Sequence, residues 1–405
     1  MSENSRSIRK IKCPGLPGTV IALGLVSFLT DLSSEMIYPL LPGFLVSVLG
    51  AGAVSLGIIE GVAESTASLL KVVSGFWSDR VRRRKPLILA GYTLSGAARP
   101  LIGLAAAWPF VLIMRFLDRI GKGLRTSPRD SLIADVTDPA VRGRAYGLHR
   151  AMDHAGAVAG PLVAAALMSF AGVSMRYVFL LAGIPSILVV IVLVKGVRES
   201  PPSVHEPDRS TPGGGWRDLG TDYRRLLLAV LVFSLGNSTD AFLLLRLTEA
   251  GVGASFIAIL WSVHHIVKMF ATYQGGRLSD MTGNRAMIIA GWIFYATIYL
   301  AFALVQSRDA LIAVFIAYGI YFGLTEPAEK SWVANLVPAS LRGTAFGYYH
   351  GAVGFAALPA SLIFGIVWQS FGVRTAFSLG AALAVIASAL VYTIPCPGPG
   401  AGEGT

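Results

Sequence analysis

The chain has 405 residues, of which 54% are hydrophobic and only 14% are charged, and its formal net charge is +11. Soluble domains contain about 25% charged residues, so this composition excludes a soluble protein and indicates a polytopic membrane protein. The positive charge does not require a nucleic-acid partner, because basic loops are typical of the cytoplasmic face of membrane proteins.

Apolar segments follow one another along the whole chain, separated by short polar breaks. The first six are Thr19–Leu49, Val54–Trp77, Pro86–Ala107, Trp108–Ser127, Arg144–Phe170 and Tyr177–Val194. The second six are Tyr223–Glu249, Ala254–Leu278, Ala286–Val305, Asp309–Asn335, Gly343–Ser370 and Arg374–Ile394. Each is close to or above the ~20 residues that a helix needs to cross a bilayer. The segments therefore predict an all-α protein with twelve transmembrane helices.

The loops between these segments predict the orientation. If the helices alternate, one side collects the basic N-terminal tail, the Arg80–Lys85 loop, Arg142, Arg144, Arg277, Arg285 and Arg342. The other side has only Arg176, Arg308 and Arg374. Positively charged loops stay inside, so we expect a multi-pass protein of the plasma (inner) membrane with both termini in the cytoplasm.

The two halves of the chain repeat each other. The run Arg142-Gly143-Arg-Ala-Tyr-Gly147 reappears as Arg342-Gly343-Thr-Ala-Phe-Gly347, and Gly75-Phe-Trp-Ser-Asp79 reappears as Gly276-Arg-Leu-Ser-Asp280. A repeat of this length predicts two related bundles that face each other. We expect an N-terminal tail (1–18), a six-helix bundle (19–194), a cytoplasmic linker (195–222), a second six-helix bundle (223–394) and a C-terminal tail (395–405).

A charged motif follows the second apolar segment. It reads Gly75-Phe-Trp-Ser-Asp79-Arg80-Val-Arg-Arg83-Arg-Lys85, and its second copy keeps Gly276, Asp280 and Arg285. An aspartate at a helix end can face the N-terminus of another helix and favour its dipole, whereas the arginines alone are equally well explained as a basic loop. With this motif the chain resembles the major facilitator superfamily over essentially its full length. The resemblance implies that Gly75, Asp79, Arg80, Arg83, Gly276, Asp280 and Arg285 latch a cytoplasmic gate.

The fourth segment also resembles this family. Its Arg115-Phe-Leu-Asp118-Arg-Ile-Gly-Lys122-Gly123 run matches the family's Arg-Phe-Leu-Gln-Gly-x-Gly-x-Gly pattern with added charges, and the resemblance links Arg115 to proton coupling. Asp118, Lys122, Arg125 and Arg129 share one helix face, which must point at charged helices or at a water-filled cavity.

The fifth segment carries small residues in a characteristic spacing. Gly147, Gly156, Gly160 and Pro161 are similar to the motif of antiporter members, although Ala164 and Ala165 replace its final glycine pair. This similarity implies a bacterial drug/proton-antiporter-like subgroup. The alternative is ordinary close packing of helices through small residues.

Acids and bases inside the apolar segments are the candidates for transport. The resemblance implies that the first, fourth, seventh and tenth helices line a central cavity, which selects Asp31, Glu35, Arg115, Asp118, Asp240, Arg246 and Glu326. A proton carrier needs a carboxylate whose protonation changes with its surroundings. We predict Asp31 as the carrier and Glu35 as the second choice. The alternative is a static ion pair, for example between Asp31 and Arg115.

These patterns predict a secondary active transporter that works by alternating access, a proton-coupled exporter (antiporter) of a small amphiphile or anion. The alternative is an importer or symporter of a metabolite or a metal complex. The chain has no His-Glu-x-x-His, Gly-x-Ser-x-Gly or P-loop motif, so we expect no enzyme activity and no cofactor. We also expect no metal site. The His265–Met269 pair could suit Cu(I), but the sequence has no Met-x-x-x-Met motif to accompany it. The expected partners are a small solute, protons and the bilayer, and the expected state is a monomer.

Overall fold

The computed structural model describes residues 15–41, 44–50, 53–81, 83–199, 216–238, 240–252 and 254–395. Most of the predicted N-terminal tail, linker and C-terminal tail lies outside the described residues. Within the described ranges every regular element is a helix, and eight helical stretches are long and apolar enough to cross a membrane. The helix that carries the charged fourth segment is not among those eight.

The helices follow the predicted order. The first half contains α1 (Gly18–Glu35), η1 (Tyr38–Leu40), η2 (Phe44–Val48), α3 (Ala53–Val81), α4 (Lys85–Leu101), η3 (Ile102–Leu104), α5 (Trp108–Asp135), η4 (Pro139–Val141), α6 (Arg142–Ala171), α7 (Met175–Leu181) and α8 (Gly183–Gly196). The second half contains η5 (Trp216–Leu219), α9 (Thr221–Gly236), α10 (Ala241–Glu249), α11 (Ala254–Thr282), α12 (Asn284–Leu304), α13 (Arg308–Leu336), η6 (Ala339–Leu341), α14 (Arg342–Phe371) and α15 (Val373–Tyr392). The twelve predicted crossings are all represented, so the predicted fold class is confirmed.

Three crossings that the sequence predicted as single helices are interrupted. The first ends its α-helix at Glu35 and continues as short 3₁₀ and π turns, because Pro39 cannot donate to a helical hydrogen bond. The sixth divides into α7 and α8, and the seventh into α9 and α10. At the last break the Tyr295 hydroxyl donates to the Gly236 carbonyl at 3.2 Å, which satisfies a group that the helix end leaves free.

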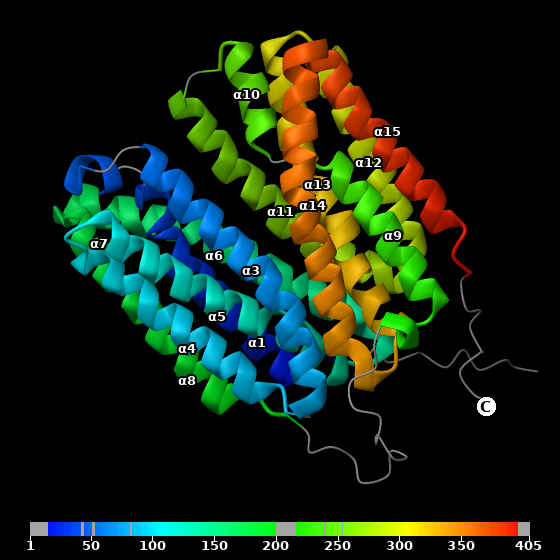
Figure 1. Cartoon of the computed structure of the whole chain (residues 1–405), viewed down its shortest axis with the longest axis horizontal. Helices are drawn as coiled ribbons and strands as arrows, with labels where there is room; N and C mark the ends of the chain where they lie inside the picture. Colours follow the sequence, from blue (N-terminus) through cyan, green and yellow to red (C-terminus); the bar gives the residue numbers. More distant parts are fainter. Residues whose placement is uncertain are drawn as a thin grey trace, which may run out of the picture.

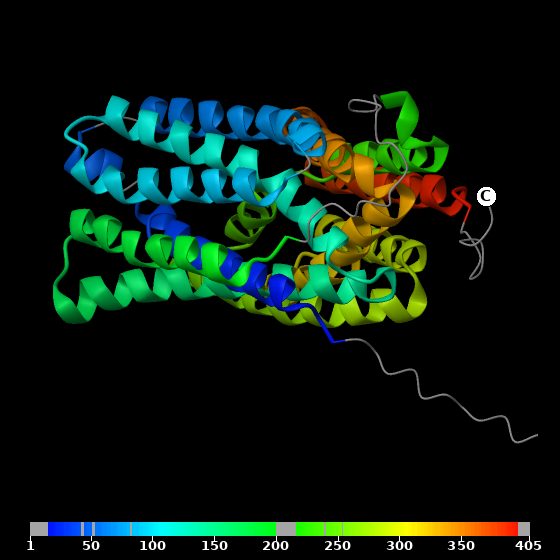
Figure 2. The same cartoon turned by 90° about the horizontal axis from the view of Figure 1, so that it is seen from below.

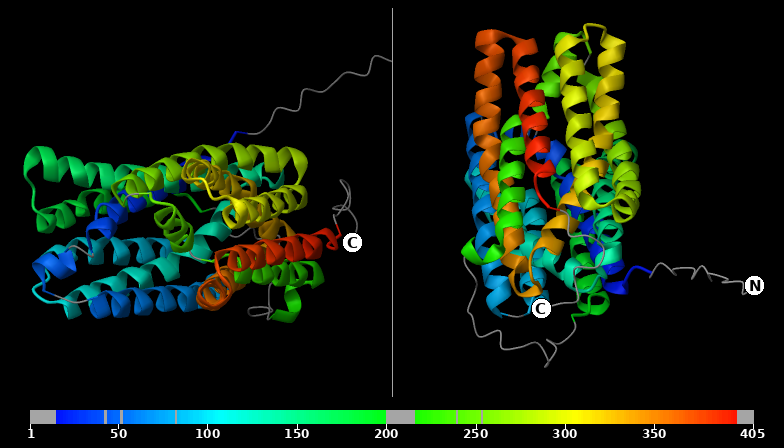
Figure 3. Two further views of the ribbon diagram at one scale, coloured as in Figure 1. Left: turned by 90° about the horizontal axis from the view of Figure 1, so that it is seen from above. Right: turned by 90° about the vertical axis from the view of Figure 1, so that its right-hand side faces the viewer.

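The two halves meet at one end of the molecule and diverge toward the other. Figure 1 shows the first half on the left and the second half on the right, joined near the end from which the C-terminus leaves, with α7 and α10 at the separated ends. Figures 2 and 3 show that the helices of each half run side by side along a common direction. The contacts between the halves are made chiefly by α6 with α11 and by α3 with α14.

Glycines allow this close approach. A Cβ placed on Gly75 of α3 would lie 2.9 Å from the Cα of Gly347 in α14, and a Cβ on Gly147 of α6 would lie 2.9 Å from the Cα of Gly276 in α11. No side chain fits at such distances, so the backbones of both helix pairs are in direct contact. The repeated glycines of the sequence therefore form two symmetry-related contacts between the halves.

Candidate functional site

Two aspartates join the halves where they meet, and we call this region the Asp79 end. The Asp79 carboxylate accepts hydrogen bonds from the backbone amides of Gly343, at 2.9 Å, and Thr344, at 2.6 Å. The Asp280 carboxylate accepts from the amides of Gly143, at 2.7 Å, and Arg144, at 2.9 Å. Each carboxylate thus faces the N-terminus of a helix in the opposite half, where free amides and the helix dipole favour negative charge.

A chain of charges reinforces one of these two contacts. Arg84 lies 3.2 Å from Asp79 and 2.6 Å from Asp135, and Asp135 in turn lies 2.6 Å from Arg342 of the second half. Burial alone would lower the pKa of the Arg84 guanidinium, but Asp135 and Asp79 outweigh burial and raise that pKa above its usual value. In the symmetry-related contact, Arg142 donates a hydrogen bond to the neutral side chain of Asn335, where Arg342 pairs with the charged Asp135 in the first.

The arginines that the sequence motif selected, Arg80, Arg83 and Arg285, are not among the residues of the contacts just described. Arg80 and Arg83 are exposed, and the Arg80 guanidinium lies 4.2 Å from the centre of the Phe76 ring. Arg285 donates to the Ile394 carbonyl at 2.9 Å, where it holds α12 against the end of α15. Sequence reasoning missed Arg84, although it occupies the position in the first repeat that Arg285 occupies in the second.

A cavity of about 300 Å³ lies between the halves. It is lined by α1, α3, α4, α5 and α6 of the first half and by α13 and α14 of the second. Its lining residues are Ser27, Thr30, Asp31, Lys71, Tyr92, Lys122, Arg125, Thr126, Arg129, Arg150, Asp153, Glu326, Lys330, Tyr349, His350 and Val353. A polar cavity with walls from both halves is where an alternating-access protein can hold a solute.

An ion pair crosses the wall of this cavity. Arg150 of α6 donates two hydrogen bonds of 2.6 Å to the two carboxylate oxygens of Glu326 on α13. Arg150 also lies 2.5 Å from Asp153, which accepts a hydrogen bond from Ser27 of α1. Two-pronged pairs of this kind are strong and orientation-specific. The sequence analysis selected Glu326 and did not select Arg150, although a charge three residues before Asp153 in an apolar helix was a usable signal.

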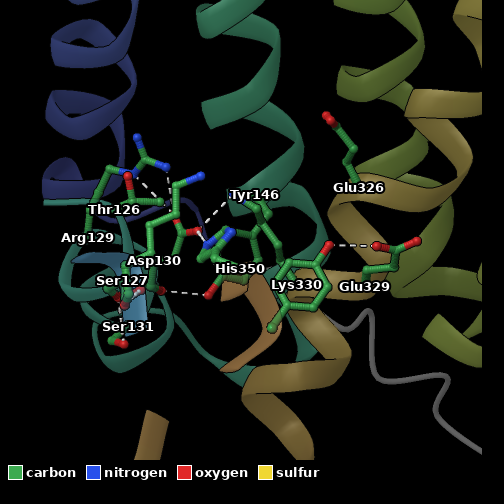
Figure 4. Close-up of polar contacts among 12 residues, drawn as sticks. Thr126, Ser127, Arg129, Asp130, Ser131, Tyr146, Glu326, Glu329, Lys330 and His350 are labelled. Atoms are coloured by element: carbon green, nitrogen blue, oxygen red, sulfur yellow. Dashed lines mark hydrogen bonds and ion pairs between the residues drawn. The ribbon is translucent and has the colours of Figure 1, made fainter. Parts of the chain in front are cut away.

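A second cross-half cluster surrounds Asp130, which is fully buried on α5. Its carboxylate lies 2.9 Å from Arg129, 2.9 Å from Lys330 of α13 and 2.8 Å from His350 of α14. Figure 4 shows Asp130 between Arg129 and His350, with Glu326 and Glu329 on a neighbouring helix. Three basic partners surround the buried carboxylate, so this cluster ties the halves together next to the cavity, which Arg129, Lys330 and His350 also line.

The predicted cavity acids are divided among different environments. Asp31 and Glu326 line the cavity. Glu35 instead packs beside Gly160, where a Cβ on the glycine would lie 2.7 Å from the Glu35 Cβ. Asp118 is buried within the first half, 2.7 Å from Arg99 of α4, so it does not share the cavity that Lys122, Arg125 and Arg129 of the same helix line.

The remaining predicted cavity residues lie outside this lining. Arg115 is 3.6 Å from Asp118 and stacks on Tyr38, with 5.5 Å between its guanidinium carbon and the ring centre. Asp240 accepts a hydrogen bond from the Tyr318 hydroxyl at 3.0 Å and lies 3.6 Å from Lys268. Arg246 donates to the Val305 carbonyl at 3.0 Å after α12. The alternative pair of Asp31 with Arg115 is not present.

The glycine motif of the fifth crossing lies against α1 and α11. A Cβ on Gly156 would lie 3.0 Å from the Cβ of Asp31, so the close approach of α6 and α1 occurs at the predicted proton carrier. Pro161 lies inside the same helix, one residue after Gly160. The motif therefore serves helix packing here, and packing at this place also sets the position of Asp31.

His265, one residue of the possible His265–Met269 metal pair, lies among aromatic rings. His265 packs against the rings of His154 and Trp261, with ring centres 5.6 Å and 5.2 Å away. Among the described residues, no group of three or more His, Cys, Asp or Glu side chains is arranged to hold a metal ion.

Comparisons with known proteins identify related chains. The family model described as Major Facilitator Superfamily matches residues 23–305 and 226–404. An uncharacterized MFS-type transporter of Methanocaldococcus jannaschii is 33% identical over 97% of both chains. The multidrug resistance protein MdtH of Salmonella arizonae is 24% identical over 81% of this chain and 82% of its own.

Solved structures share the fold at low identity. The human organic anion transporter MFSD10 matches with a TM-score of 0.79 and 17% identity, covering 93% of this chain and 100% of its own. The proton:xylose symporter XylE matches with a TM-score of 0.74 and 17% identity, covering 93% and 95%.

Proposed function

Because the chain belongs to the major facilitator superfamily and is therefore a secondary transporter rather than an enzyme, we propose that it exports a small solute in exchange for protons. The solute occupies the cavity between the halves. In the conformation described here the Asp79 end is closed, and transport requires a second conformation in which this end opens and the opposite end closes. The glycine motif beside Asp31 and the similarity to MdtH, a multidrug resistance protein, support export.

The observation that carries proton coupling is the environment of Asp31. The other two cavity carboxylates are held by Arg150, at 2.5 Å from Asp153 and 2.6 Å from Glu326. The Asp31 carboxylate forms no ion pair with any residue in the described part of the chain. A carboxylate without a fixed cationic partner can accept and release a proton without leaving a buried cation uncompensated, which is what a coupling group must do.

The orientation and location complete the proposal. The basic loops gather at the Asp79 end, so we assign this end, both termini and the linker to the cytoplasmic side of the plasma membrane. The transported solute then has access to the cavity from outside in this conformation, and from the cytoplasm in the other. A single chain contains both halves and the cavity, so the proposed working unit is a monomer.

The test measures accumulation of anionic, cationic and neutral compounds in efflux-deficient cells that express the intact protein, with and without an uncoupler. The test variant is Asp31→Asn and the matched control is Asp309→Asn, whose side chain is 91% exposed. We expect lower accumulation of some compound in cells with the intact protein or the control. Both the uncoupler and Asp31→Asn should erase that difference. Higher accumulation would instead indicate an importer, and unchanged coupling in Asp31→Asn would refute the assigned carrier.

A further inference from the structure

We propose that the cavity binds its solute as a small hydrophilic anion and that Arg125 contacts this anion directly. The inference rests on the proposed transport function, because it assigns the substrate class of the same cavity. It starts from the cavity-lining side chain of Arg125, which differs from the neighbouring Arg99, Arg129 and Arg150 in lacking an ion pair with a carboxylate in the described part of the chain.

Arg125 lines the cavity and is only 4% exposed. One terminal nitrogen donates to the Ser95 hydroxyl at 2.6 Å, and the guanidinium lies 4.3 Å from the centre of the Tyr92 ring. Its buried Nε has no hydrogen-bond partner, and no carboxylate in the described part of the chain forms an ion pair with it. Ser95 and Tyr92 therefore hold the guanidinium in place without neutralising it.

Three neighbouring arginines are paired with carboxylates. Arg99 lies 2.7 Å from Asp118, Arg129 lies 2.9 Å from Asp130, and Arg150 lies 2.6 Å from Glu326. A buried guanidinium that lacks such a partner is costly, unless a ligand supplies the negative charge. An arginine fork suits carboxylate, phosphate and sulfate groups, because it presents parallel N–H donors to two oxygens.

The charge of the lining agrees with this assignment. Six cationic side chains, Lys71, Lys122, Arg125, Arg129, Arg150 and Lys330, face three carboxylates, those of Asp31, Asp153 and Glu326. Arg129 and Lys330 also contact Asp130, which lies outside the lining, and with this fourth carboxylate included the positive groups still outnumber the negative ones. An anionic solute is attracted to such a site, whereas a cation is repelled from it.

The size and polarity of the cavity further restrict the class of solute that it can bind. Its volume of about 300 Å³ is at the lower end of the ~300–1,000 Å³ that ligand pockets usually have. Val353 is the only aliphatic residue among the lining residues of the described chain. Large apolar drugs need apolar walls, so a compact, water-soluble organic anion fits this cavity better than an amphiphile.

The experiment uses the purified full-length protein in lipid nanodiscs and measures thermal stabilisation and calorimetric binding. The probes are inorganic phosphate, sulfate, acetate, succinate and glucose 6-phosphate, each at up to millimolar concentration. Succinamide and glucose are the uncharged counterparts of the last two probes, and tetraphenylphosphonium is the cationic comparison. The variants are Arg125→Gln and Arg125→Lys. Arg225→Gln is the control, because it removes the same charge from an exposed position.

We expect at least one anion to stabilise the intact protein and its uncharged counterpart or the cation to have no effect. Arg125→Gln should weaken that binding at least ~10-fold, since one charge-assisted hydrogen bond accounts for such a factor. Arg125→Lys should fall between, because it keeps the charge and loses the fork. If Arg125→Gln does not fold, the test rests on Arg125→Lys, which should bind the anion more weakly than the intact protein. Binding of no anion, or equal binding by the Arg125 and Arg225 variants, would overturn the inference.

The same samples in proteoliposomes separate this inference from the proposed function. Anion binding that depends on Arg125, without any flux coupled to a proton gradient, would support the anion site and refute proton-coupled export. Proton-coupled flux of neutral or cationic compounds that is insensitive to Arg125→Gln would support export and overturn the anion site.

Discussion

Arg150 of α6 and Glu326 of α13 form a two-pronged ion pair that joins the two halves of the molecule beside the cavity. In the proposed transport cycle, opening of the Asp79 end separates these helices, so we expect the pair to break. The same holds for the contacts of Asp130 with Lys330 and His350. Four residues that line the cavity, Arg150, Glu326, Lys330 and His350, therefore also make contacts between the halves.

We first predict that Glu326→Gln shifts the protein toward a conformation with an open Asp79 end. Among the described residues, the variant leaves Arg150 with Asp153 as its only ion-pair partner. The closed state should lose about 2–3 kcal/mol of stability, less than the roughly 3–5 kcal/mol for fully buried pairs. Spin labels at the exposed positions Val81 and Met281, near the ends of α3 and α11, report the separation. Serines first replace the two native cysteines, Cys13 and Cys396.

The expected readout is a longer and broader distance distribution in Glu326→Gln than in the intact protein. Glu249→Gln is the control, because Glu249 is exposed, lies 3.9 Å from its partner Arg246 and is not among the lining residues of the cavity. Identical distributions in Glu326→Gln and the intact protein would show that this ion pair does not hold the halves together.

Asp79 and Asp280 should stabilise the closed state of the Asp79 end to different extents. Asp79→Asn loses an acceptor for one of two amides and leaves Arg84 without one of its two carboxylates, whereas Asp280→Asn affects only amide contacts. We expect Asp79→Asn to weaken the closed state by about 2–3 kcal/mol and Asp280→Asn by about 1 kcal/mol. Both should slow transport without changing which compounds bind. The label pair described above and a flux assay measure the two effects, and a larger effect of Asp280→Asn would contradict this ranking.

Gly147→Ala should prevent the halves from closing fully. Its methyl group would meet the backbone of Gly276 at 2.9 Å, where neither helix can move aside without loss of contact, and overpacking of this kind costs about 1–3 kcal/mol. Gly365→Ala is a matched control in another helix, because its methyl group would make an ordinary 3.4 Å contact with Phe242. Reduced transport with normal expression is expected for the first variant alone, and equal activity of the two variants would refute the prediction.

Asp118→Asn should affect folding rather than coupling. Asp118 is buried within the first half, and its loss leaves the guanidinium of Arg99 without a carboxylate. Such a change costs about 3–5 kcal/mol, so the melting temperature and the yield should fall clearly. Transport per folded molecule should keep its dependence on protons, in contrast to Asp31→Asn. If the Asp118→Asn protein were normally stable but had lost proton coupling, the prediction would be wrong and Asp118 would have a role in coupling.

The sequence by itself determined the class of the protein and the order of its crossings. The length of each apolar segment and the spacing of the polar breaks reflect the thickness of a bilayer, because every crossing must span it independently of the others. The repeats at Gly75 and Gly276 and at Gly147 and Gly347 were also visible, because close backbone contact admits only the smallest residue. The interruptions of the first, sixth and seventh crossings were not predicted, since the hydrophobicity of a segment continues across a break.

Only the tertiary structure decided which charges meet. Asp118 and Lys122 occupy one helix face in sequence terms, yet Asp118 pairs with Arg99 inside the first half while Lys122 lines the cavity. Arg84 and Arg150 became visible only when helices distant in the chain were placed together. Ion pairing depends on distances of a few ångströms between separate elements, and neither periodicity nor composition contains those distances.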